Sequence, residues 1–139
     1  MTTITPEQLA ASGSEDGEQL AVMQWCALHY NKYPELKWLH HSPNGGFRNQ
    51  REAAKFKALG VKPGFHDLIL LVRKGPYIGL SIEMKSLKVK GHKNGGATDE
   101  QILWANHLIG QGFYVRLCHG WQSAVQVIEE YLNVSNSPI

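Results

Sequence analysis

Asp67, Glu83 and Lys85 have the types and the spacing of a site that binds a divalent metal ion and hydrolyses phosphodiesters. Asp67 begins an apolar run, and Glu83 and Lys85 stand two residues apart in the next strand-like segment. Two carboxylates, together with a main-chain carbonyl for which Met84 is the expected donor, offer the oxygen ligands that Mg²⁺ or Mn²⁺ prefers. The lysine would orient the attacking water or help to deprotonate it.

A second interpretation of the same three residues requires no catalysis. Asp67 can cap a turn, and Glu83 can pair with Lys85 on a solvated strand face. On motif spacing alone this second interpretation is the more frequent one. The choice therefore depends on what else the chain brings to the three residues.

Two further polar residues stand in the first turns of predicted helices. Ser12 or Ser14 can cap a helix that contains Glu18, and Thr98 begins a capping-box pattern that ends at Gln101. Glu18 would face the metal or its waters, and Gln101 would face a phosphate or Lys85.

The elements that must position these residues follow from hydrophobic periodicity and from turn residues. Asp67 and the segment with Glu83 form a predicted hairpin, with Ser81, Glu83 and Lys85 on one face of its second strand. A helix expected at 48–59 would turn Ala53, Phe56 and Leu59 inward and end at Gly60. The expected strands are 36–41, 67–72, 77–85 and 113–118, and the expected helices are a short one after Thr5, then 15–30, 48–59, 102–109 and 123–132. This order predicts one α/β domain over 1–139, in which a central mixed sheet is flanked by helices, residues 1–13 are peripheral and 133–139 form a frayed tail.

Composition is ordinary for a folded chain, with 42% hydrophobic and 19% charged residues and a formal net charge of +2. No apolar run is long enough to cross a bilayer and the first residues do not resemble a signal peptide, so a cytoplasmic protein without membrane contact is expected. Cys26 and Cys118 both stand in apolar periodic segments, where buried thiols are the usual outcome.

Basic residues gather in two stretches although the net charge is small. Arg51, Lys55, Lys57 and Lys62 belong to one stretch, together with Arg48. Lys88, Lys90 and Lys93 belong to the other, which follows the strand of Glu83 and runs into a glycine-containing loop expected to be flexible. The second stretch is either a solvated surface or a surface that binds a phosphate backbone without reading bases.

One long portion of the chain resembles a known family. The stretch HSPNGGFRNQREAAKFKALGVKPGFHDLILL, followed by GLSIEMKS and by a helix that begins DEQILWANHL, is similar to the virus-type replication-repair nuclease (VRR-NUC) family. That family belongs to the PD-(D/E)XK nuclease superfamily, so the resemblance implies a restriction-endonuclease-like core. It covers about 18–131.

The resemblance assigns a role to each matching residue. It implies that Asp67 and Glu83 hold the metal, that Lys85 is the catalytic lysine, that Gln101 is the motif glutamine and that Glu18 is the acid of the first helix. It also places Asn44 and Arg48 near the DNA path. Family members usually carry proline before the motif aspartate, whereas this chain has His66 there, an imidazole that can contact DNA or serve the fold.

The resemblance further implies a stand-alone, phage-type enzyme that works in a phage or in its bacterial host. Members of this size resemble homodimeric enzymes that resolve four-way (Holliday) junctions in DNA repair, and two-fold symmetry suits paired cuts. The alternatives are a flap-processing or restriction-like nuclease, and a nucleic-acid-binding module without catalysis. The last alternative predicts damaged motifs, whereas Asp67, Glu83, Lys85 and Gln101 are all present.

Overall fold

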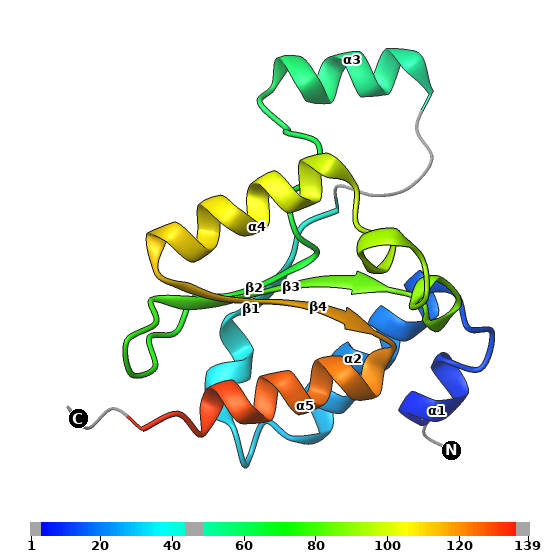
Figure 1. Ribbon diagram of the computed structural model, residues 1–139. Coiled ribbons are helices and arrows are strands. Elements are labelled where there is room, and N and C mark those ends of the chain that lie inside the picture. The colour runs from blue at the N-terminus through cyan, green and yellow to red at the C-terminus, as the bar shows by residue number, and fades with distance from the viewer. Residues whose placement is uncertain (1–3, 44–48, 136–139) are drawn as a thin grey trace.

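A four-stranded mixed sheet with helices on both faces forms the centre of the molecule (Figure 1). The computed structural model describes residues 4–43 and 49–135. The strands lie in the order β1-β2-β3-β4, and they are β1 (Leu39–His41), β2 (Leu68–Leu70), β3 (Gly79–Lys85) and β4 (Phe113–His119). This arrangement confirms the predicted α/β class with a mixed sheet.

The pairing of β2 with β3 confirms the predicted hairpin. The two strands are antiparallel, with Leu68 opposite Ile82 and Leu70 opposite Leu80. β3 then pairs in parallel with β4 along its whole length, from Gly79 opposite Phe113 to Lys85 opposite His119. Because parallel neighbours need a crossover, helix α4 (Asp99–Gln111) connects these two strands.

The two faces of β3 have different tasks. Leu80, Ile82 and Met84 belong to the hydrophobic core, which α2 (Glu15–Leu28) and α5 (Trp121–Leu132) close from one side (Figure 1). Ser81 lies on the opposite face, toward α4, where it contacts the imidazole of His66. The predicted alternation along this strand is therefore confirmed, but every residue of β3 is buried.

The helix ends follow their sequence signals. Thr5 and Thr98 each form a complete capping box, at α1 (Pro6–Leu9) and at α4. Ser14 caps α2 by accepting the N–H of Gly17. Asn133, expected in a frayed tail, is the C-cap of α5, and its side chain donates to the Glu129 carbonyl at 2.7 Å. The two cysteines are buried free thiols, as expected.

Two local expectations were wrong. The segment Pro34–Trp38 forms the 3₁₀ helix η1, so the strand predicted over 36–41 is reduced to β1, because Pro34 favours a helical first turn. The second expectation concerned α3 (Gln50–Ala58), which buries no residue: Ala53 and Leu59 are exposed and Phe56 is half-buried. The basic segment after β3 contains the short 3₁₀ segments η2 (Leu87–Val89) and η3 (Lys93–Gly96), and within η3 the residues Asn94 and Gly95 adopt left-handed, non-helical conformations.

Within the described residues, none of the helices is long and apolar enough to cross a membrane.

Candidate metal centre

Asp67 reaches the centre of the site because it directly precedes β2. Its Oδ2 atom accepts the N–H of Met84 at 2.7 Å, just beyond the pair that Leu68 forms with Ile82. Its main-chain carbonyl accepts the N–H of Ser42 and the Nδ1–H of His41, both at 2.9 Å. The Asp67 carboxylate is thus held at the start of β2, against β3 and beside the end of β1.

Glu83 lies beside Asp67 and is almost fully buried, with 3% of its surface exposed. Burial, a side-chain hydrogen bond with Asp67 and the charge of Asp67 raise the pKa of Glu83 to about 10, against the smaller opposing effect of Lys85. Without a cation beside it, the uncharged form of the Glu83 carboxyl group is therefore favoured. Among the described buried polar side-chain atoms, Glu83 Oε1 is without a hydrogen-bond partner.

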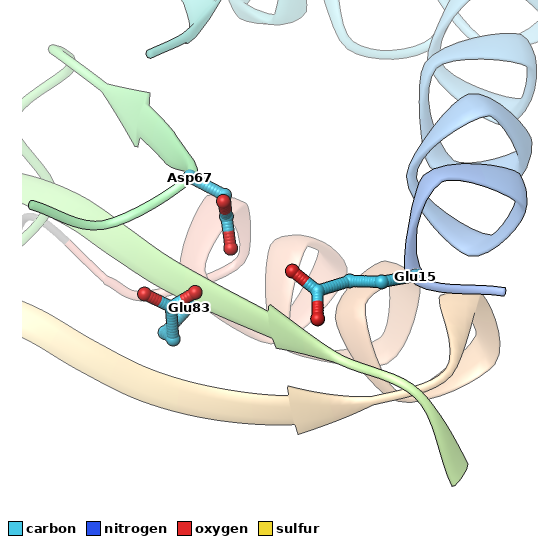
Figure 2. A group of neighbouring side chains, drawn as sticks. All are labelled: Glu15, Asp67 and Glu83. Atoms are coloured by element: carbon cyan, nitrogen blue, oxygen red, sulfur yellow. The ribbon is translucent and has the colours of Figure 1, made fainter. Parts of the chain in front are cut away.

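The third acid of the group is Glu15, at the first position of α2. One ligand atom from each of Glu15, Asp67 and Glu83 lies within 4.8 Å of the others, and Figure 2 shows the three side chains converging from α2, from the start of β2 and from β3. Burial and then the charge of Asp67 raise the pKa of Glu15. The like charges repel one another, and a cation between them would remove that repulsion.

These observations fit a hard divalent cation. Three carboxylates provide oxygen ligands, and the partnerless Oε1 of Glu83 is a buried acceptor that lacks a donor. The Met84 carbonyl is a fourth candidate. A strand residue directs its N–H and C=O to the same side, and the Met84 N–H points to Asp67.

Glu18 does not join the group. It is 4% exposed, and its Oε2 atom accepts the main-chain N–H of Trp121 at 2.6 Å. Trp121 is the first residue of α5, whose N-cap is Gly120 and which has no side-chain cap of its own. The carboxylate therefore satisfies a free N–H at the positive end of that helix.

Helical periodicity in α2 could have identified this difference from the sequence. Glu18 stands three and four residues before Ala21 and Val22, which are both fully buried, and so it shares the inner face of the helix. Glu15, one turn earlier, stands at the end of the helix, from which a side chain can reach the edge of the sheet. The sequence interpretation placed an acid of this helix at the site, and in the structure the acid that lies near Asp67 and Glu83 is Glu15, one turn before Glu18.

His66 is buried inside the fold, which agrees with the structural one of the two roles considered for it. It is 2% exposed, with its Nε2 bonded to the Gln101 carbonyl at 3.0 Å and its Nδ1 to the Ser81 hydroxyl at 2.8 Å. Burial lowers the pKa of His66. The neutral ring therefore donates from Nε2 to the carbonyl and accepts from the serine hydroxyl.

Gln101 is near the site, but its side chain already has a structural task. Its Oε1 accepts the N–H of Thr98 at 2.9 Å in the capping box that starts α4. Gln101 and Glu83 line the same cavity of about 340 Å³ between α4 and the sheet. The structure therefore brings Gln101 close to Glu83.

Lys85 is buried at the end of β3, two residues beyond Glu83. Its positive charge lowers the pKa of both Glu83 and Glu15 against the larger raising effects on each. An ammonium group next to three acids matches the charge balance expected of the motif lysine.

The remaining predicted contacts are at the surface or outside the described residues. Lys88, Lys90 and Lys93 are exposed, on or beside η2 and η3, in the segment that follows β3. Asn44 and Arg48 lie outside the described residues.

Comparison with known proteins identifies the fold independently of the motif. The sequence matches no family model and no curated protein. A solved structure described as a VRR_NUC domain protein is similar over 98% of this chain and 94% of its own, with a TM-score of 0.71 and 31% sequence identity. With that identity over nearly the full length of both chains, and with the D…ExK residues gathered at one end of the sheet, this chain belongs to the VRR_NUC family and has a nuclease-type domain.

Proposed function

We propose that the protein is a divalent-metal-dependent DNA endonuclease, with Asp67, Glu83 and Glu15 as the ligands of a Mg²⁺ or Mn²⁺ ion. One observation carries the proposal: three carboxylates from separate elements converge within 4.8 Å, and the buried Oε1 of one of them has no partner. Glu15 replaces Glu18 in the ligand set, because Glu18 is bonded to the start of α5.

The residues around the ion have separate tasks in this proposal. When bound, the ion neutralises charge on the scissile phosphate and makes a water molecule acidic enough to attack it. The Lys85 ammonium orients that water and attracts the phosphate. The Met84 carbonyl completes the oxygen set. The amide group of Gln101 remains a proposed phosphate contact, since its Oε1 is the atom used in the capping box.

The substrate in this proposal is DNA. The exposed Lys88, Lys90 and Lys93 follow the catalytic strand, and they bind phosphates without selecting bases. Asn44 and Arg48 remain proposed contacts of the same DNA. The whole chain acts as one nuclease domain.

Branched DNA is the proposed substrate class, and a homodimer is the proposed active form. Within residues 4–43 and 49–135 the chain of 15.6 kDa offers a single such acid group, so paired cuts on the two strands of a four-way junction need a second copy. Sedimentation at micromolar concentration should give twice the chain mass. A monomer that prefers flaps would contradict the junction assignment and leave the nuclease assignment intact.

A cleavage assay tests the core of the proposal. Labelled four-way junction, flap and linear duplex are incubated with Mg²⁺, with Mn²⁺ or with chelator, and products are separated on denaturing gels. We expect metal-dependent cutting, fastest on the junction and symmetric on opposite strands. Asp67→Asn is the matched control, because it keeps the side-chain volume and removes a charged ligand. Binding without cutting under every metal condition would favour the non-catalytic alternative.

A further inference from the structure

Helix α3 stands apart from the rest of the protein, beyond α4 on the side away from the sheet (Figure 1). It belongs to a described segment, residues 49–63, which we call the arm. No residue of α3 is buried, and Leu59, which caps it, is 70% exposed. The helix thus gains little from packing against its own chain.

Local interactions define both ends of α3. The Asn49 side chain accepts the N–H of Glu52 at 2.8 Å at its start. At its end Gly60 adopts a left-handed conformation, with φ of 104°, and Val61 donates to the Phe56 carbonyl at 2.9 Å. A helix of nine residues with such caps is still marginal in water when nothing packs against it. A bound partner would stabilise it.

The charge of the arm indicates the chemistry of that partner. Arg51, Lys55, Lys57 and Lys62 are all exposed, against the single acid Glu52. Among the described residues, the ion pairs that form involve none of these four basic side chains. Arg51 and Lys55 are four residues apart and so share one face of the helix. A surface of this charge is suited to a polyanion.

The C-terminal end of the arm runs into the segment that leads to Asp67. On the C-terminal side, Trp104 of α4 donates from Nε1 to the Pro63 carbonyl at 3.0 Å. Next to it Gly64, with φ of 83°, lies so close to the start of α4 that a Cβ would be 2.5 Å from the Glu100 carbonyl carbon. The arm is therefore connected to the segments that position Asp67.

We infer that the arm binds the phosphate backbone of DNA lying in the active site, beyond the phosphate that is cut. This inference rests on the proposed nuclease function and adds a second contact surface to it, separate from the lysines after β3. Its C-terminal end is bonded to α4 at Pro63, four residues before Asp67, and its unpaired cations match the charge of the substrate. Phosphate contacts of this kind add affinity without sequence preference.

The test is the triple variant Arg51→Gln, Lys55→Gln, Lys57→Gln, in which glutamine keeps helix propensity and removes charge. Binding of a 30-base-pair duplex is followed by fluorescence anisotropy in chelator, from about 50 to 200 mM salt. We expect affinity to fall about tenfold or more at the lowest salt, and the slope of log affinity against log salt to flatten by up to about 3. The matched control is Lys32→Gln, Lys37→Gln, Arg73→Gln, three exposed cations outside the arm.

Cleavage separates this inference from the proposed function. The arm variant should still cut a short duplex of about 8 base pairs as fast as the wild-type protein, because the acid group is intact, and should lose its advantage on long DNA. An unchanged salt slope, or an equal loss in the control variant, overturns the inference. The inference is also overturned if the arm variant has half the solution mass of the wild-type protein but binds DNA equally well. That result would mean that the arm contacts a second copy of the chain. If wild-type protein binds long DNA through the arm but cuts no substrate, the proposed function fails and the binding surface stands.

Discussion

One carboxylate oxygen of Glu83, which is almost fully buried, lies within 4.8 Å of one of Asp67. Such a pair holds one proton where two negative charges would repel each other. Asp67 also accepts the Met84 N–H, so the pair is fixed to β3 at two points. The protonation state of this pair controls the binding of a cation.

Removal of either member of the pair should abolish cleavage. Asp67→Ala and Glu83→Ala should each lose metal-dependent activity by orders of magnitude while the fold is retained, because each removes a ligand and little core volume.

Lys85→Ala should lose most turnover and keep its metal affinity, since the lysine acts on water and phosphate. Gel assays and calorimetric metal titrations measure both properties. Full cleavage by either acid variant, or a loss of metal affinity in Lys85→Ala as large as that in Glu83→Ala, would contradict the assignment.

Metal binding should release a proton near neutral pH. Burial and the neighbouring Asp67 raise the pKa of Glu83 to about 10, so a cation must displace the Glu83 proton to bind that oxygen. We expect affinity to rise with pH, by up to about tenfold per unit, between pH 6 and 9. Calorimetry in buffers of different ionisation enthalpy measures the released proton directly. Affinity independent of pH would mean that Glu83 is already ionised.

The raised pKa of Glu83 also predicts how the stability of the metal-free protein changes with pH. The folded state holds a proton on Glu83 that the unfolded state loses above pH 4.5, so stability falls as pH rises from about 4.5 to about 10. Glu83→Gln should remove this loss and raise the Tm at pH 8 more than at pH 5. Thermal melts in chelator at the two pH values measure the difference. An equal Tm change at both would show that the glutamate is not the titrating group.

Glu15 and Glu18 should have opposite effects. Glu15→Ala should lower metal affinity and activity with little loss of stability, because Glu15 is exposed at the start of its helix. Glu18→Ala should cost about 1 to 3 kcal/mol of folding free energy, because it leaves the start of α5 without its buried acceptor. Its folded fraction should still bind metal. Denaturant unfolding and metal titration separate the two, and a reversed outcome would return Glu18 to the ligand set.

His66 should act through the fold. His66→Ala leaves the Ser81 hydroxyl and the Gln101 carbonyl without their partner, which should cost about 2 to 4 kcal/mol. Ser81→Ala removes one of these bonds and should cost less. DNA affinity of folded His66→Ala, measured by anisotropy well below its Tm, should match that of the wild-type protein. A large loss of DNA affinity in a stable variant would show that the imidazole reaches the substrate.

The sequence predicted the hairpin, both capping boxes and the central acids, because these depend on local spacing. Asp67 and Glu83 meet across one antiparallel pair, so alternation and a turn suffice to bring them together. Periodicity in α2 marks Glu18 as an inward-facing residue, but its partner is on α5, about a hundred residues later, and local patterns do not show that contact. The exposed α3 was predicted as a packed helix for a similar reason: its pattern is amphipathic, and the apolar side has no sheet to cover.

The bond between Glu18 and Trp121 also has a consequence for the timing of activity during synthesis. The helix that carries Glu15 packs against β3 and is also bonded to the start of α5, so its full set of contacts forms only after α5 has been synthesised and packed. The hairpin that brings Asp67 and Glu83 together can form earlier, but the group of three acids would still lack a fully positioned Glu15. A nascent or truncated chain would therefore lack an assembled cutting centre, and damage to nucleic acid by incomplete copies would be limited by the order in which the chain folds.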